Sequence, residues 1–179
     1  MRLSVVRLCL PLFLVSCGTA SSEKEPAQTG FAGSARAIDG DTLSMDFRLL
    51  GIDAPEKRQL CGLKAGCWPC GKAAQDFLAR ALRGSDVQIT LVKRRTYGRQ
   101  VATAAIAGED LGDRLIAAGL AIPQPQYLKN DPERAARYET SFAAARATSV
   151  GMHQGRWIEP ARWRRGERLS CERPPSPRG

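Results

Sequence analysis

One arginine and two acids stand at the end of a short apolar segment, where their side chains could act on a phosphate group. The segment is FRLLGIDAPE, residues 47–56, and the three residues are Arg48, Asp53 and Glu56. Carboxylates can hold a hard cation or take a proton from water, and a guanidinium can pair with two phosphate oxygens. With Asp41 and Arg99 added, the residue types needed for phosphodiester hydrolysis are present without an activated histidine.

Each of these residues also has a structural interpretation. Arg48 and Glu56 could form an ion pair at a strand end. The Asp-Gly dipeptide at residues 39–40 is a strong hairpin signal, so Asp41 could simply serve the turn. A turn role is the preferred interpretation of Asp39, with an outer-sphere metal role as the alternative. Arg99 could be an ordinary surface residue after a turn.

The elements that must position these side chains are short strands followed by helices. Alternation and turn signals predict strand segments at residues 34–45, 47–53, 86–93 and 99–107, the first of which contains a hairpin. Helical spacing of apolar residues predicts helices at 72–84, 109–119 and 131–148. The pattern favours a mainly β fold with α, a five-stranded OB-fold barrel with about three packed helices.

Three motifs in a fixed order resemble the staphylococcal-type thermonuclease family. They are AIDGDT at 37–42, FRLLGIDAPE at 47–56 and YGR at 97–99, and the resemblance extends over residues 35–163. The ordered set is specific, although no single motif is. The resemblance implies an OB-fold nuclease that hydrolyses DNA, RNA or both with low sequence specificity and leaves 3′-phosphate products.

The resemblance also implies one calcium ion, held by Asp41, Asp53 and the main-chain carbonyl of Ala54. The spacing of the two aspartates imposes a condition on this site. If residues 42–50 formed one straight strand, the aspartates would lie roughly 40 Å apart, at about 3.3 Å per residue. We therefore expect the chain to reverse near residues 44–46.

By the same resemblance, Glu56 would activate or orient the attacking water. Arg48 and Arg99 would hold the phosphate and stabilise its charge in the transition state. The chemistry of these side chains agrees with these roles, because guanidinium groups match phosphate oxygens and stay protonated.

Further candidates for substrate contacts are Lys93, Tyr97 and Tyr127. Lys93 could also be a solvated strand end, and Tyr127 could serve ordinary packing. Tyr127 falls where family members place a tyrosine that contacts the nucleotide. His153 is the single histidine, and we interpret it as structural or exposed rather than as a general base.

The first sixteen residues, MRLSVVRLCLPLFLVS, are typical of a bacterial signal peptide. Arg2 and Arg7 form a basic region before an apolar run, residues 8–15, that is too short to span a bilayer. The segment ends in LVSC, which resembles a lipobox, so that Cys17 would carry the lipid. An ordinary signal cleaved nearby, for example after Ala20, is the alternative. We expect an exported protein of the cell envelope, lipid-anchored and facing the periplasm or the cell surface.

The whole chain divides by composition into four segments. Residues 1–16 are assigned to the signal peptide, and the small polar residues of 17–32 read as a flexible tether. Residues 33–165 contain the nuclease-like domain. Residues 166–179 form a tail rich in arginine and proline.

Four cysteines would remain in the mature domain, and an exported protein would form disulfides between them. We favour the pairs Cys61–Cys70 and Cys67–Cys171, although three pairings are possible. The CWPC motif at 67–70 could instead belong to a zinc site or a redox pair. A zinc site would need a second ligand pair at similar spacing, which the sequence lacks.

The formal net charge of +9 fits either a well-solvated surface or an anionic partner such as nucleic acid. The preferred function is an exported, calcium-dependent nuclease that favours single strands. Its partners would be DNA or RNA and the membrane at Cys17, and no protein partner is indicated. One alternative is a non-catalytic binding lipoprotein on the same fold. Another is a structural envelope lipoprotein that holds anionic polymers.

Overall fold

The computed structural model describes residues 35–173. The predicted signal peptide, Cys17 and the predicted tether lie outside these residues. All of the described residues belong to one unit of the chain. None of the helices that they form is long and apolar enough to cross a membrane.

The largest sheet has four strands and carries both of the predicted phosphate-binding arginines. Its strands are β3 (Phe47–Leu49), β8 (Arg99–Ile106), β7 (Val87–Thr96) and β9 (Glu109–Asp110). β8 pairs in parallel with β3 and antiparallel with β7 and β9. β7 and β8 are joined at Tyr97 and Gly98, whose φ angles are 49° and 76°. Two positive φ angles in a two-residue loop are typical of a tight β-hairpin.

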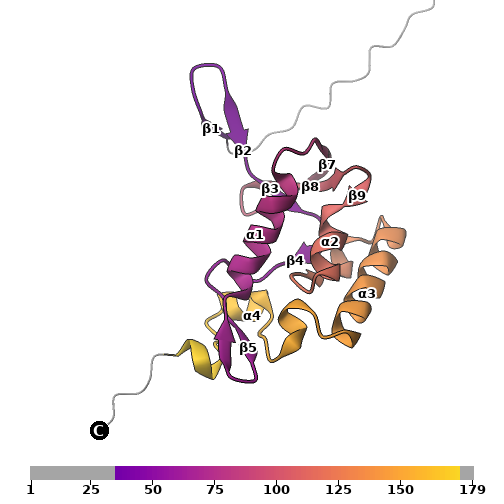
Figure 1. The fold of residues 1–179 in the computed structure, drawn as a ribbon. Coiled ribbons are helices and arrows are strands. Elements are labelled where there is room, and N and C mark those ends of the chain that lie inside the picture. Colours follow the sequence, from indigo (N-terminus) through magenta and orange to yellow (C-terminus); the bar gives the residue numbers. More distant parts are fainter. Residues whose placement is uncertain (1–34, 174–179) are drawn as a thin grey trace, which may run out of the picture. The chain divides into compact units, whose positions relative to one another are not determined.

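The other strands form three two-stranded sheets. They are β1 (Ala35–Ala37) with β2 (Leu43–Met45), β4 (Ile52–Asp53) with β10 (Ile122–Pro123), and β5 (Cys61–Leu63) with β6 (Gly66–Trp68). The described strands therefore do not close into the expected five-stranded barrel (Figure 1). The general expectation of short strands with packed helices is confirmed.

The predicted strand at residues 47–53 is divided into β3 and β4. The chain turns between them at Gly51, which has a φ of 73°. A Cβ at Gly51 would also lie 2.6 Å from a side-chain carbon of Leu128. Glycine therefore permits both the turn and the close packing that send β4 toward β10.

Three helices follow the predicted ones closely, and a short fourth comes near the end. They are α1 (Cys70–Leu82), α2 (Leu111–Ala117), α3 (Pro132–Ala147) and α4 (Pro160–Arg164). Asp110 and Asp131 cap α2 and α3 by accepting hydrogen bonds from the main-chain N–H groups of Asp113 and Arg134. Short 3-10 turns form η1 (Pro125–Tyr127), η2 (Gly151–Gln154) and η3 (Ser170–Glu172).

The core lies between the helices and the short strands β4 and β10. One cluster of buried side chains joins α1, α2, α3 and β4, and consists of Ile52, Ala74, Leu115, Ile116, Leu120, Ala121, Leu128 and Tyr138. A second cluster consists of Cys61, Cys70, Ile122 and Met152, and the partly buried Trp157 packs against it. Burial of these side chains fixes the end of β4, where Asp53 stands.

The structure contains two disulfides, Cys61–Cys70 and Cys67–Cys171. This is the pairing that the sequence analysis favoured. Both cysteines of the CWPC motif are thus bonded to partners outside it. The second disulfide ties η3 to β6, across 104 residues of sequence.

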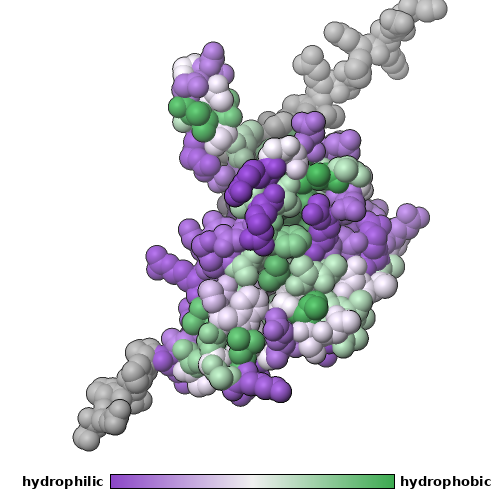
Figure 2. Space-filling view, viewed as in Figure 1, coloured by the Kyte–Doolittle hydropathy of each residue, from purple (hydrophilic) through white to green (hydrophobic). Residues whose placement is uncertain are grey.

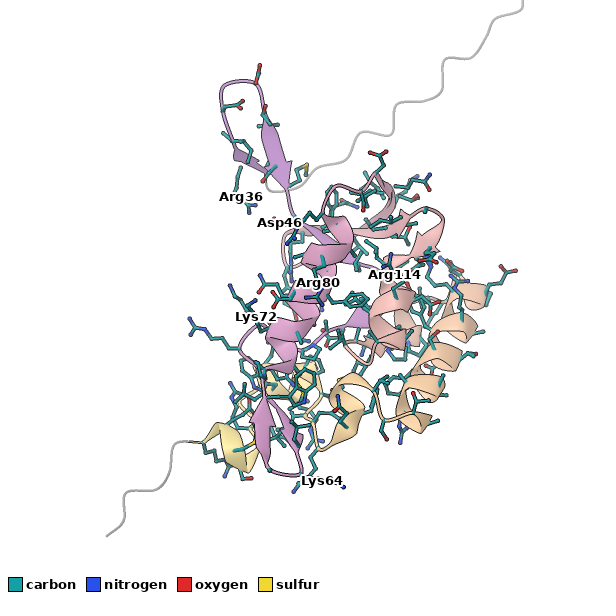
Figure 3. The ribbon with its side chains drawn as sticks, viewed as in Figure 1. Arg36, Asp46, Lys64, Lys72, Arg80 and Arg114 are labelled. Atoms are coloured by element: carbon teal, nitrogen blue, oxygen red, sulfur yellow. A yellow bond between two sulfur atoms is a disulfide. The ribbon has the colours of Figure 1, made fainter. Side chains whose placement is uncertain are left out.

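The hairpin of β1 and β2 is paired only with itself, and it projects from the rest of the described chain (Figure 1). Ile38 and Leu43 in this hairpin are 65% and 70% exposed, and Figure 2 shows hydrophobic surface on the projecting hairpin. At its base, Arg36 forms an ion pair with Asp46 at 3.0 Å (Figure 3).

The expected reversal near residues 44–46 does not produce pairing between β2 and β3. Ser44 and Met45 pair with β1 instead, and β3 pairs with β8. The single residue between β2 and β3 is Asp46, which is too short a connection for a hairpin loop. Because β2 pairs with β1 rather than with β3, the β1–β2 turn does not fold back toward β4.

Candidate active site

Most of the predicted site residues line one groove. The groove has a volume of about 800 Å³, and its lining includes Arg48, Asp53, Ala54, Glu56, Tyr97 and Arg99. Arg164 and Arg165, which the sequence analysis did not select, also line it. A smaller cavity of about 280 Å³ shares Arg48, Asp53, Tyr97 and Arg164 with the groove and adds Tyr127. The two hollows form the candidate active site.

The parallel pairing of β3 and β8 places two arginines on one face of the sheet. Arg48 pairs with Val101, and neighbouring residues on paired strands point to the same side. Arg99 lies two residues before Val101 on β8, so its side chain points to that side as well. Two guanidinium groups therefore face the groove from adjacent strands, an arrangement that suits a phosphate group.

Asp53 is the most enclosed acid of the site, with its side chain 9% exposed. Arg48 donates to its Oδ1 from Nη2 at 3.3 Å. Arg164 donates to Oδ1 from Nη1 at 3.1 Å and to Oδ2 from Nη2 at 2.8 Å. A carboxylate this buried needs charged or polar partners, and two guanidinium groups supply them.

Glu56 shares Arg164 with Asp53. Its Oε1 accepts a hydrogen bond from Nη1 of Arg164 at 2.7 Å. Hydrogen bonding with Asp53, followed by that with Glu56, raises the pKa of the Arg164 guanidinium above its usual range. Arg164 is therefore a permanent cation between the two acids.

The main chain of Glu56 is held by a buried amide that the sequence analysis did not select. Gln59 is fully buried, and its Oε1 accepts from the Glu56 N–H at 3.1 Å. Its Nε2 donates to the carbonyl of Ile158 at 2.6 Å. Gln59 thus connects the Glu56 turn to the segment that enters α4, which carries Arg164.

A glycine allows the first turn of α1 to approach Glu56. A Cβ at Gly71 would lie 1.7 Å from the main-chain oxygen of Glu56, which is closer than any side chain permits. The N–H of Gly71 also donates to the carbonyl of Gln59 at 3.1 Å. No local pattern marks Gly71, Gln59 or Arg164 as site residues, because their partners are set by packing. The only sequence signal was the arginine-rich WRR at 163–165.

Asp41 lies apart from this group. It is exposed in the β1–β2 turn, and it does not line the groove. Its N–H donates to Oδ1 of Asp39 at 3.2 Å, and its own Oδ1 accepts from the Thr42 hydroxyl at 3.1 Å. These contacts agree with the structural interpretation of Asp41 as a turn residue, which the sequence analysis left open.

The arrangement does not fit the expected calcium site. Calcium takes six to eight oxygen ligands, but both oxygens of Asp53 accept hydrogen bonds from guanidinium groups. Asp41 stands on a separate hairpin. Within residues 35–173, no group of three or more acidic, histidine or cysteine side chains could hold a metal ion.

The two tyrosine candidates for substrate contacts lie at the groove and the adjoining cavity. Tyr97 is 87% exposed on the β7–β8 turn, and Tyr127 is 46% exposed in η1. Lys93 is exposed on β7 and is not among the lining residues. The structure therefore brings the tyrosines, but not Lys93, to the candidate site.

His153 lies outside the groove, between two aromatic rings. It makes edge contacts with Phe142 and Trp157, at centroid distances of 5.1 and 5.7 Å. Burial lowers the pKa of His153, and its Nε2 has no hydrogen-bond partner within the described residues. This placement agrees with a structural role.

Comparison with known proteins agrees with the motifs. The family model of the staphylococcal nuclease homologue matches residues 46–155. A protein of Escherichia coli O157:H7 named "Uncharacterized endonuclease" is 32% identical over 105 residues, or 54% of this chain and 62% of that protein. A Haemophilus influenzae protein of the same name is 29% identical over 141 residues, which are 74% of this chain and 71% of that protein.

The match begins at Asp46 and ends at Gly155, so it includes Arg48, Asp53, Glu56 and Arg99. The chain spans less than two thirds of the E. coli O157:H7 relative. With the ordered motifs and the groove that gathers these four residues, the match shows that the chain belongs to the staphylococcal nuclease homologue family.

Proposed function

We propose that the protein is an exported, calcium-dependent nuclease that hydrolyses phosphodiester bonds of DNA, RNA or both. It would act with low sequence specificity and leave 3′-phosphate ends. One observation carries the proposal, which is that Arg48, Arg99, Asp53 and Glu56 line the same groove. The endonuclease names of the relatives support a nuclease in general.

The charge of the groove favours a polyanion. Its lining has four arginines, Arg48, Arg99, Arg164 and Arg165, and two acids, Asp53 and Glu56. The excess of positive charge would attract backbone phosphates, which give affinity without reading the sequence of bases. The exposed rings of Tyr97 and Tyr127 offer surfaces on which unpaired bases could stack, which supports a preference for single strands.

The roles of the groove residues follow from their chemistry. Arg48 and Arg99 would bind the phosphate oxygens from one face of the sheet, and they would stabilise the charge that grows in the transition state. Glu56 would accept a proton from the attacking water. Gln59 would hold the Glu56 main chain in place through its hydrogen bond to the N–H group.

Calcium dependence is proposed from the family resemblance, with Asp41, Asp53 and the Ala54 carbonyl as ligands. Because the described arrangement does not fit this set, calcium binding would require two changes. Arg164 would have to release Asp53, and the β1–β2 hairpin would have to approach β4.

A non-catalytic binding protein is the second candidate function. The observation that favours it is that guanidinium groups already neutralise Asp53 and Glu56 while Asp41 is remote. Such a protein would bind nucleic acid in a salt-dependent manner without cleaving it.

The test is a cleavage assay on the full chain with its disulfides intact. The substrates are single-stranded DNA, double-stranded DNA and RNA, each with calcium or with a chelator. The variant is Glu56→Gln, and the matched control is Glu139→Gln, an exposed position on α3. Loss of a general base costs about 10²- to 10⁴-fold in rate, so we expect a fall of at least about 100-fold in Glu56→Gln alone.

Cleavage that requires calcium and falls in Glu56→Gln would support the proposal. Products whose 3′ ends accept a polymerase only after phosphatase treatment would support the 3′-phosphate assignment. Equal rates in the two variants would refute the role of Glu56. Salt-sensitive binding without cleavage in any condition would favour the binding protein.

We also propose that the chain is exported to the cell envelope and anchored to the membrane by lipid on Cys17. This proposal rests on the signal-like segment and the LVSC motif. Labelling of the chain with a radioactive fatty acid should be abolished in Cys17→Ser. Labelling that persists in this variant would refute the anchor.

A further inference from the structure

A second groove, which shares no lining residue with the candidate active site, is rich in arginine. It has a volume of about 650 Å³ and lies where the β5–β6 hairpin meets the segment of α4 and η3 (Figure 1). Its charged lining residues are Arg156, Arg162, Glu167, Arg168 and Arg173. We propose that this second groove binds backbone phosphates of the nucleic-acid strand that occupies the candidate active site. The inference rests on the proposed function, which makes nucleic acid the substrate.

Two of these arginines are already engaged by the protein itself. Arg162 donates from Nε to Oε2 of Glu167 at 2.6 Å. The guanidinium of Arg168 lies 3.7 Å from the ring centroid of Trp163, and its Nη1 donates to the main-chain carbonyls of Trp163 and Glu167 at 2.6 and 2.7 Å. Arg162 thus neutralises the acid of the second groove, and Arg168 fastens the loop that follows α4.

Arg156 and Arg173 remain available to an anion. Both residues are exposed, and neither guanidinium has an acidic partner or a hydrogen-bond acceptor among residues 35–173. The acid in the lining of the second groove, Glu167, is already paired with Arg162, so the charge that faces a ligand is positive. Guanidinium groups stay protonated and match the oxygens of a phosphate, which makes a phosphate the anion that this groove suits best.

The main chain that carries these two arginines is held on both sides of the groove. The carbonyl of Arg156 accepts a hydrogen bond from the N–H of Gly62 in β5 at 2.6 Å. The Cys67–Cys171 disulfide ties β6 to η3, which ends directly before Arg173. Binding of a phosphate would therefore order two side chains without having to order the backbone, which lowers the entropic cost of binding.

The helix α4 connects the second groove to the candidate active site. Arg162 lines the second groove, whereas Arg165, the residue that ends the helix, lines the active-site groove. Side chains three residues apart on a helix are neighbours, with about 5–6 Å between their Cβ atoms. With five residues, α4 is also only about 7.5 Å long. A strand that leaves the active site across α4 would therefore pass from one arginine group to the next.

The shape of the second groove favours a nucleic-acid strand over a membrane. The groove is concave, and a single strand can lie along it, whereas the headgroups of a flat bilayer would meet only its rim. Trp157 also lines the groove and is partly buried, so its ring could support an unpaired base beside the phosphates. Cationic groups next to an aromatic ring are the combination that binds single strands without reading their sequence.

The experiment measures binding of a fluorescent single-stranded DNA by anisotropy, at several salt concentrations and with a chelator present. A strand of about 20 nucleotides is used, because one OB-fold site accepts only roughly 4–16 nucleotides. All proteins are the full chain with its disulfides intact and carry Glu56→Gln, so that the strand stays whole. The test variant adds Arg156→Gln and Arg173→Gln. The matched control adds Arg83→Gln and Arg146→Gln, which remove the same charge from exposed positions outside both grooves.

Loss of two phosphate contacts has a defined effect on the salt dependence. The slope of log affinity against log salt should become about 1.4 less steep in the test variant, at about 0.7 for each contact with a single strand. This change makes binding about 25-fold weaker at about 0.1 M salt, when the affinities converge at about 1 M. The control should keep the slope of the parent protein. Thermal melting checks that every variant is folded.

Equal slopes in the test variant and the control would overturn the inference, even if the wild type cleaves nucleic acid. Vesicles of equal parts phosphatidylcholine and phosphatidylglycerol provide a second arm. Weaker vesicle binding by the test variant with unchanged strand binding would also overturn the inference, because the groove would then face the membrane. The expected change in slope without cleavage by the wild type would uphold the second groove and refute the nuclease proposal. Absence of strand binding in every protein would refute both.

Discussion

Replacing Gln59 by methionine should both destabilise the domain and loosen Glu56. The side chain is fully buried, and methionine has a similar volume but cannot replace either hydrogen bond. The buried carbonyl of Ile158 would lose the donor at 2.6 Å, which costs about 1–3 kcal/mol. The partly buried N–H of Glu56 can form a hydrogen bond with water instead, so we assign about 1 kcal/mol to the loss of its bond to Gln59.

The expected loss in free energy of unfolding is therefore about 2–4 kcal/mol. For a domain of roughly 140 residues, each kcal/mol lowers Tm by about 3–4 °C, which gives a fall of roughly 6–16 °C. Thermal melting by circular dichroism measures it, with Gln75→Met as the control at an exposed position of α1. We also expect slower cleavage by the folded variant, because the Glu56 turn loses its anchor.

Gln59→Glu separates the lost donor from the changed shape. The carboxylate could still accept from the Glu56 N–H, but it would face the Ile158 carbonyl without a proton to donate. Burial would raise the pKa of this carboxyl, so its stabilising contribution would be present in acid and lost as pH rises. Stability relative to the wild type should thus improve from pH 7 to pH 4. A decrease in Tm of less than about 2 °C in Gln59→Met would refute the reasoning. A stability of Gln59→Glu relative to the wild type that does not change with pH would refute it as well.

Two further predictions concern the buried Tyr138 and the partly buried His153. Tyr138→Phe removes a hydroxyl that donates to Oδ1 of Asp110 at 2.7 Å, and urea denaturation should show a loss of about 1–2 kcal/mol. Because burial raises the pKa of Tyr138, the wild type should also lose stability above pH 10, where the unfolded tyrosine ionises, and the variant should lose less. Burial lowers the pKa of His153, so the unfolded chain binds a proton at a pH where the folded chain does not. The free energy of unfolding should therefore fall between pH 7 and pH 5. His153→Phe should reduce this fall in the urea midpoint, and an unchanged pH dependence would contradict the account.

Local sequence was sufficient for features that neighbouring residues determine. The Asp-Gly and Tyr-Gly dipeptides marked the β1–β2 and β7–β8 turns. At the second turn both residues have the positive φ angles of a tight hairpin, which few residues adopt. Apolar spacing marked the helices, including the face of α3 that buries Tyr138 and Ala145. The ordered motifs, read together, were sufficient for the family, and they contain four charged residues of the groove, Arg48, Asp53, Glu56 and Arg99.

Sequence could not decide which strand the segment after Thr42 would join. Pairing of a short strand depends on the surfaces that meet it rather than on its own composition. Ser44 and Met45 pair with β1, and Asp46 joins them directly to β3. Asp41 is consequently separated from Asp53, although the family resemblance implied one metal site for both.

The partners of the acids were decided only by the tertiary structure. Arg164 lies 111 residues from Asp53 and 108 from Glu56, and Gln59 lies 99 residues from Ile158. No helix or strand period relates positions so far apart. The sequence by itself determined which residues have the chemistry to act on a phosphate and the local turns that present them. Packing of the last helix against the Glu56 turn decided that a guanidinium stands between the acids, because only the assembled core brings these segments into contact.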